Sequence, residues 1–141
     1  MNGYLGVDVG SVSTKLVVVD DCLNILASIY TSTAGKPIET VQECLKEIKR
    51  DLPDKVEICG VGVTGSGREV ASVVVGADVV KNEITAHAIA ASNIIPDVNT
   101  IIEIGGQDSK IIILRDGIVV DFAMNTVCAA GTGSFLDHQA A

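Results

Sequence analysis

One pattern occurs twice in this sequence, and the repetition constrains the fold more than any other feature. The stretch "DVGSVSTKLVVVDD" (8–21) aligns without gaps with "EIGGQDSKIIILRD" (103–116), so that matched residues lie 95 positions apart throughout. Each copy reads as a strand end, an acidic residue, a glycine turn, a small hydroxyl residue, a lysine and a second aliphatic strand. A third strand is expected after both copies. We therefore predict an internal duplication built around two related β-hairpins.

The remaining apolar and turn patterns predict a mixed α/β fold. Strands are expected at 3–9, 14–20, 23–30, 56–63, 100–105, 109–115 and 118–123, with helices after Lys36, after "TGSG" and after Asn82. The first three strands should be antiparallel, and "VEICGVGV" should join them in parallel in a sheet of five strands at most. Residues 100–123 should form a separate three-stranded meander. This organisation predicts a first lobe at 1–96 and the start of a second lobe at 97–141.

Composition excludes several classes of function. The 141 residues are 48% hydrophobic but only 3% aromatic, which indicates an aliphatic core, and the formal net charge of -8 argues against nucleic-acid binding. No apolar run approaches the roughly 20 residues of a membrane span, so we expect a cytoplasmic protein without membrane contact. The cysteines form no C-x-x-C pair and are expected to be reduced. Cys44 and Cys59 are expected in the core and Cys22 in a turn.

The two glycine turns suit phosphate binding. Backbone N–H groups in such a turn can converge on an anion, and Asp8 and Glu103 at the preceding strand ends can hold a hydrated Mg²⁺ that bridges to phosphate. Ordinary hairpins also use Gly and Ser, but the duplication favours the functional interpretation. Gln107 and Asp108 are candidates to position the metal or an attacking water. The predicted nucleotide contacts are Gly10, Ser11, Val12, Ser13 and Lys15 in the first copy, and Gly105, Gly106, Ser109 and Lys110 in the second.

Several stretches resemble known families. "GVDVGSVSTKLVV" and "IGGQDSK" resemble the two phosphate motifs of the actin, sugar-kinase and heat-shock-chaperone ATPase superfamily. More narrowly, "TGSGRE", "NEITAHAIAA", "IIEIGGQDSKIIIL" and "MNTVCAAGTGSFLD" resemble activators of 2-hydroxyacyl-CoA dehydratases in the BadF/BadG/BcrA/BcrD ATPase family. The resemblance implies a ribonuclease-H-like (actin-like ATPase) domain and the first strands of its duplicate. It also implies a homodimeric ATPase that uses ATP and Mg²⁺ and drives a low-potential electron from a 4Fe-4S cluster into a CoA-ester dehydratase or reductase.

By the same resemblance, Cys128 matches the first of two cluster cysteines, each subunit supplying two thiolates to a cluster shared across the dimer. The alternative is a buried cysteine at a helix start. Glu103 departs from the superfamily, which usually has Asp there. The second cysteine and the adenine site are expected beyond Ala141. The chain is therefore expected to be an N-terminal fragment that does not turn over ATP alone and lacks the cluster.

Two other classes of protein would have the same phosphate turns. One is a small-molecule kinase, and the other is a non-enzymatic, actin-like assembly or regulatory module that binds nucleotide. Cys128 favours the activator, because a kinase has no need of a thiolate at that position. The roles of Arg68, after the "TGSG" turn, and His87, within a predicted helix, stay open between structural and functional. The sequence does not specify which acyl-CoA the partner would use.

Overall fold

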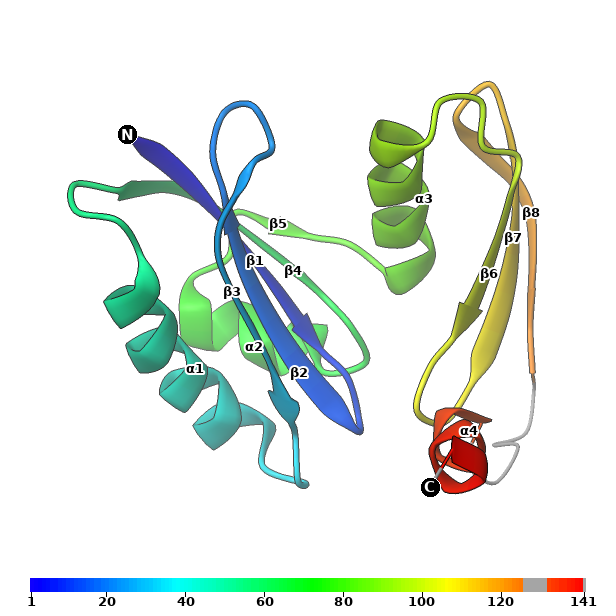
Figure 1. Cartoon of the computed structure of the whole chain (residues 1–141), viewed down its shortest axis with the longest axis horizontal. Helices are drawn as coiled ribbons and strands as arrows, with labels where there is room; N and C mark the ends of the chain where they lie inside the picture. Colours follow the sequence, from blue (N-terminus) through cyan, green and yellow to red (C-terminus); the bar gives the residue numbers. More distant parts are fainter. Residues whose placement is uncertain (126–131, 141) are drawn as a thin grey trace. The chain divides into compact units, whose positions relative to one another are not determined.

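The computed structural model describes residues 1–125 and 132–140. The chain divides into two compact units, Met1–Asn82 and Glu83–Ala141, which are called the first and second unit below (Figure 1). In the described part of the chain, no helix combines the length and the apolar character needed to cross a membrane.

The first unit contains a five-stranded sheet in the order β3-β2-β1-β4-β5 (Figure 1). The strands β1, β2 and β3 pair antiparallel, whereas β4 and β5 join in parallel, which confirms the predicted topology. The strand β5 was not predicted, because two residues are too short to produce a periodic pattern. The strand bounds are Asn2–Val9 (β1), Ser13–Val19 (β2), Ile25–Ser32 (β3), Glu57–Thr64 (β4) and Val79–Val80 (β5).

Two helices complete the first unit, α1 (Pro37–Asp51) and α2 (Arg68–Val75). The helix α1 begins at a proline, whose fixed φ suits a first turn, and it buries Val41, Cys44 and Ile48. Alternate residues of β1 and β2 bury their side chains in the same core, as period-two alternation requires. The predicted core position of Cys44 is confirmed, and burial raises the pKa of its thiol.

The prediction for Cys59 is wrong, because this residue is exposed. In the pairing of β1 with β4, Gly3 lies opposite Ile58 and Tyr4 lies opposite Gly60, so Cys59 is the extra residue of a β-bulge. A bulged residue leaves the regular alternation of the strand. The apolar run "VEICGVGV" carries no signal of such a bulge, since it reads as an uninterrupted buried strand. Cys22 lies in an exposed turn, as expected.

The second unit consists of α3 (Glu83–Ile94), a meander of three antiparallel strands and α4 (Thr132–Ala140). The strands are β6 (Thr100–Ile104), β7 (Ser109–Arg115) and β8 (Ile118–Met124), in agreement with the predicted meander. A small core forms where Ala88 of α3 packs with Ile112 and Leu114 of β7. Contacts group α3 with the second unit, whereas the boundary expected at residue 96 would assign it to the first. That boundary stays a prediction.

Candidate functional site

The two hairpins that the sequence duplicates have the same geometry. Asp8 lies directly opposite Lys15 in the β1–β2 pair, and Glu103 lies directly opposite Lys110 in the β6–β7 pair. Both turns also close in the same way. The N–H of Gly10 donates to the carbonyl of Ser13 at 2.9 Å, and the N–H of Gly105 donates to the carbonyl of Asp108 at 2.8 Å. The duplication is therefore confirmed at the level of register and turn hydrogen bonding.

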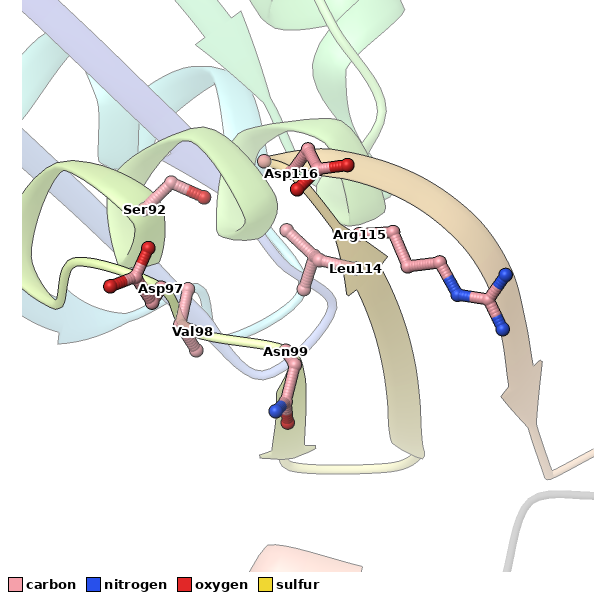
Figure 2. A pocket seen from close by; sticks show the side chains of 8 residues that line it. Ser92, Asp97, Val98, Asn99, Leu114, Arg115 and Asp116 are labelled. Atoms are coloured by element: carbon pink, nitrogen blue, oxygen red, sulfur yellow. The ribbon is translucent and has the colours of Figure 1, made fainter.

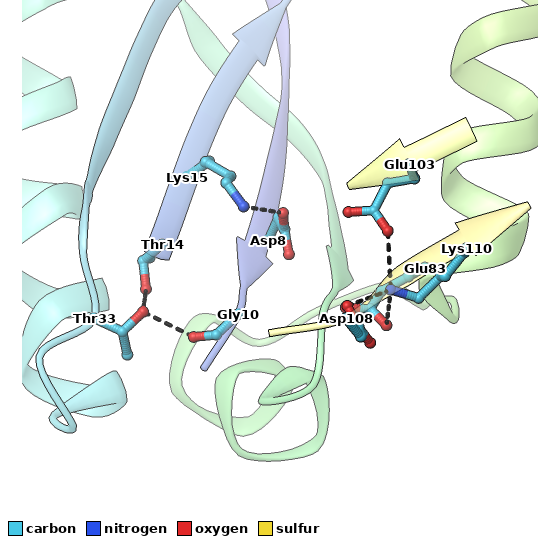
Figure 3. Close-up of polar contacts among 9 residues, drawn as sticks. All are labelled: Asp8, Gly10, Thr14, Lys15, Thr33, Glu83, Glu103, Asp108 and Lys110. Atoms are coloured by element: carbon cyan, nitrogen blue, oxygen red, sulfur yellow. Dashed lines mark hydrogen bonds and ion pairs between the residues drawn. The ribbon is translucent and has the colours of Figure 1, made fainter. Parts of the chain in front are cut away.

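A buried threonine supports the first turn from behind. Thr33, which follows β3, is 3% exposed. Its hydroxyl donates to the carbonyl of Gly10 at 2.8 Å and shares a 2.9 Å hydrogen bond with the hydroxyl of Thr14, while its N–H donates to Val12 (Figure 3). These bonds hold the Gly10–Ser13 turn in one conformation. A fixed turn can present its backbone to an anion without being reordered on binding.

Asp8, the acidic residue of the first hairpin, is partly exposed to solvent. Lys15 Nζ lies 3.0 Å from Asp8 Oδ2, and the two side chains are 38% and 33% exposed. The ammonium also lies 5.6 Å from the centre of the Tyr30 ring. A carboxylate held in this way has one oxygen occupied by a cation and remains reachable from solvent, so it can serve as a ligand to a hard metal ion.

Glu103, the acidic residue of the second hairpin, belongs to a cluster of part-exposed carboxylates around one buried lysine. Lys110 Nζ lies 3.0 Å from Glu103 Oε2, 3.0 Å from Asp108 Oδ1 and 3.9 Å from Glu83 Oε2, and its side chain is only 3% exposed (Figure 3). Glu83 was not predicted as a site residue. The sequence "NEITAHAIAA" indicates that Glu83 stands at the start of a helix. It does not indicate the contact with Lys110, which depends on how α3 packs on β7.

The carboxylates around Lys110 keep it charged despite its burial. Burial alone disfavours the ammonium and lowers the pKa of Lys110. Hydrogen bonds to Asp108 and Glu103, together with the negative charge of Glu83, outweigh burial and raise that pKa above its ordinary value. Because the folded-state pKa is raised, the resulting stabilisation is fully present below the unfolded pKa and is lost as the pH rises through the folded value.

We predict that Lys110→Met destabilises the protein more than Lys15→Met does. The substitution keeps the aliphatic stem but removes the cation from three carboxylates that are 19–36% exposed. The loss should exceed the value of about 0–1 kcal/mol for a surface pair and stay below the value of about 3–5 kcal/mol for a fully buried one. Urea unfolding would measure the change. Lys15→Met is the matched control, because the duplicated Lys15 makes one part-exposed ion pair, and such pairs contribute about 0–1 kcal/mol. Equal losses in the two variants would contradict the assigned difference between the lysines.

The other predicted residues are placed as follows. In the first turn Ser11 and Val12 are exposed and Gly10 and Ser13 are half-buried, and in the second turn Gln107 is exposed while Gly105, Gly106, Asp108 and Ser109 are half-buried. Arg68 donates from Nη1 to the carbonyl of Gly65 at 3.1 Å, and half-buried His87 lies within α3. Cys128 lies outside the described residues. Within the described ranges, no cluster of three or more His, Cys, Asp or Glu side chains is arranged to hold a metal ion by itself.

A pocket of about 470 Å³ lies at the other end of the second hairpin (Figure 2). Its lining includes Ser92 of α3, Leu114 at the end of β7 and the Arg115–Gly117 turn. The predicted phosphate turn precedes the start of β7, so this pocket and that turn lie at opposite ends of the strand. None of the predicted site residues lines the pocket.

Solved structures with little sequence similarity define the class to which this fold belongs. A Ppx/GppA phosphatase from Aquifex aeolicus matches with a TM-score of 0.57 at 20% identity, covering 89% of this chain and 52% of that one. At that identity the likeness concerns the fold alone. The strand order, the duplicated acid–lysine hairpins and the matching solved structures show an α/β fold of the actin-like class.

The sequence comparison identifies the family within that class. The chain belongs to the BadF/BadG/BcrA/BcrD ATPase family, whose profile matches residues 5–141. It is 39% identical to the (R)-2-hydroxyglutaryl-CoA dehydratase activating ATPase of Acidaminococcus fermentans over 140 residues, which cover 96% of this chain and 52% of that protein. It also matches the structure of the activator of the 2-hydroxyisocaproyl-CoA dehydratase from Clostridium difficile with bound ADPNP. That match has a TM-score of 0.81 and 37% identity, and it covers 98% of this chain and 51% of that one. The chain thus spans about half the length of these relatives.

Proposed function

We propose that this chain acts as part of an ATPase that activates a 2-hydroxyacyl-CoA dehydratase or a related acyl-CoA reductase. The observation that carries the proposal is the pair of hairpins with equivalent acid–lysine registers. Relatives from Acidaminococcus fermentans, Clostridioides difficile and Anaerotignum propionicum are named as activators of dehydratases. One of the matching activator structures has bound ADPNP, which is an ATP analogue.

In the proposed function, each of the two turns contributes contacts to the phosphates of ATP. Backbone groups of Gly10–Ser13 and Gly105–Ser109 would contact phosphate oxygens, and Lys15 and Lys110 would balance part of their charge. Asp8 suits the nucleotide's Mg²⁺, which binds proteins through one or two carboxylates and keeps several waters. Glu103 is the corresponding candidate in the second turn, although Lys110 already holds one of its oxygens.

The acceptors of the second turn are the proposed water-positioning groups. Phosphoryl transfer to water requires a residue that orients the attacking oxygen rather than a covalent nucleophile. Asp108 and Gln107 lie in the second turn, and Asp108 is fixed by Lys110 at 3.0 Å. We include Glu83 in the same cluster, because its carboxylate approaches the same ammonium.

Cys128 is the proposed ligand of a 4Fe-4S cluster shared with a second copy in a cytoplasmic homodimer. Cysteine thiolates are the usual ligands of such clusters, which supply the one-electron chemistry. The described residues on either side of the cysteine contact the second phosphate turn. Asn125 exchanges hydrogen bonds with Ser109 at 3.0 and 3.3 Å, and a Cβ on Gly133 would lie 2.7 Å from the carbonyl oxygen of Gly105. The described residues that flank the Cys128 segment in the chain therefore lie against the second phosphate turn.

The complete gene product, purified without oxygen, tests the proposal. We expect Mg-ATP hydrolysis, bound iron and sulfide, and ATP-dependent electron transfer to a 2-hydroxyacyl-CoA dehydratase. Phosphorylation of a small molecule without bound iron would support the kinase instead. Nucleotide binding that drives assembly, without iron or catalysed hydrolysis, would support the assembly module.

A further inference from the structure

A polar row crosses three neighbouring strands on one face of the first sheet. Asp8 of β1 lies opposite Lys15 of β2 on one side and opposite Thr64 of β4 on the other. The preceding pair, Val7 and Val63, is buried in the core at 2% and 4% exposure. Because side chains alternate along a strand, Asp8 and Thr64 share the opposite face.

The hydroxyl of Thr64 is buried without a hydrogen-bond partner among the described residues. A buried donor that lacks a partner costs free energy in the free protein. Such a group therefore calls for an explanation, and a role in catalysis or beside a bound ion is one of the recognised explanations. In the sheet register, Thr64 is paired with Asp8.

The turn after Thr64 is fitted closely against Asp8. Gly65 has a φ of +96°, and a Cβ at this position would lie 2.6 Å from Asp8 Oδ1 and closer still to the carbonyl oxygen of Val9. The N–H of Gly67 donates to that same carbonyl at 2.8 Å. Thr64 is thus held beside the end of β1 by a turn that tolerates no side chain at Gly65.

We propose that Thr64 is a positioning residue for Asp8, and that its hydroxyl donates a hydrogen bond to the Asp8 carboxylate when Mg²⁺ is bound there. This inference rests on the proposed function of Asp8. In the free protein Lys15 holds Asp8 Oδ2 at 3.0 Å. A metal ion competes with that ammonium for the carboxylate, and carboxylates that bind metals are themselves usually hydrogen-bonded by neighbouring groups. Thr64 is the donor on the side of Asp8 away from Lys15.

Titration calorimetry with ADP, in Mg²⁺ and in EDTA, tests this role in the complete gene product. We expect Thr64→Val to weaken Mg-ADP binding roughly 10- to 100-fold, the usual cost of losing a partner of a metal ligand. Binding of metal-free ADP should not change. Thr64→Val should also raise the melting temperature of the nucleotide-free protein by roughly 2–6 °C, because it removes an unpartnered buried hydroxyl. Thr64→Ser keeps the hydroxyl and should therefore bind Mg-ADP as tightly as the wild type.

Ser92→Ala is the matched control, since the Ser92 hydroxyl of α3 is also buried without a partner among the described residues. It should raise the melting temperature similarly and leave Mg-ADP binding unchanged. The inference is overturned if Thr64→Val binds Mg-ADP like the wild type. It is also overturned if Thr64→Val lowers the melting temperature of the nucleotide-free protein, because the Thr64 hydroxyl would then already form a stabilising hydrogen bond there. A wild-type protein that binds neither form of ADP would refute the proposed function itself.

Discussion

Asp8→Ala should abolish Mg-ATP hydrolysis by the complete gene product while leaving its fold intact. The substitution removes the carboxylate proposed to hold the metal, and loss of such charge stabilisation lowers kcat by roughly 10²- to 10³-fold or more. The structural cost should be small, because the ion pair that Asp8 forms with Lys15 joins two side chains that are 33% and 38% exposed. Pairs of that kind contribute about 0–1 kcal/mol. Phosphate release measures the activity, and circular dichroism measures the fold.

Asp21→Ala provides the control for this experiment. Asp21 follows β2, at the other end of the hairpin from the turn, where its carboxylate accepts a hydrogen bond from the Tyr4 hydroxyl at 2.9 Å. That bond raises the pKa of Tyr4. Its loss should leave hydrolysis unchanged, since it is remote from the Gly10–Ser13 turn. Wild-type turnover in Asp8→Ala would remove Asp8 from the metal site.

Cys128→Ser should eliminate bound iron and electron transfer, and it should retain ATP binding. A serine oxygen is a poor substitute for a thiolate in a 4Fe-4S cluster, whereas the proposed ATP contacts lie in the two hairpin turns. Iron and sulfide analysis, visible absorption and reduction of a dehydratase partner would measure the loss under anaerobic conditions. Equilibrium binding of ADPNP would establish that the nucleotide site survives.

Cys59→Ser is the matched control for the cluster experiment. Cys59 is exposed in the β-bulge of β4, so its substitution tests whether any accessible thiol affects the iron content. We expect full iron in this variant. A normal cluster spectrum in Cys128→Ser would refute the ligand assignment and favour the kinase.

Local sequence patterns were sufficient to predict the hairpins and their duplication. The register that places Asp8 opposite Lys15, and Glu103 opposite Lys110, depends on a short turn and on alternating apolar residues. Both features lie within about 15 consecutive residues, so the sequence contains the information directly. The α1 helix was predictable for the same reason, because its apolar spacing and its starting proline are local.

Contacts between residues distant in sequence were decided only by the tertiary structure. Thr64 lies beside Asp8 because β4 pairs in parallel with β1, and Glu83 reaches Lys110 because α3 packs on the second sheet. The bulge at Cys59 arises from the same long-range pairing. The sequence by itself determined which residue types stand at each turn and which strands form hairpins. Tertiary packing decided that Lys110 is buried among three carboxylates while Lys15 remains part-exposed, because burial depends on which elements cover a position rather than on its neighbours in the chain.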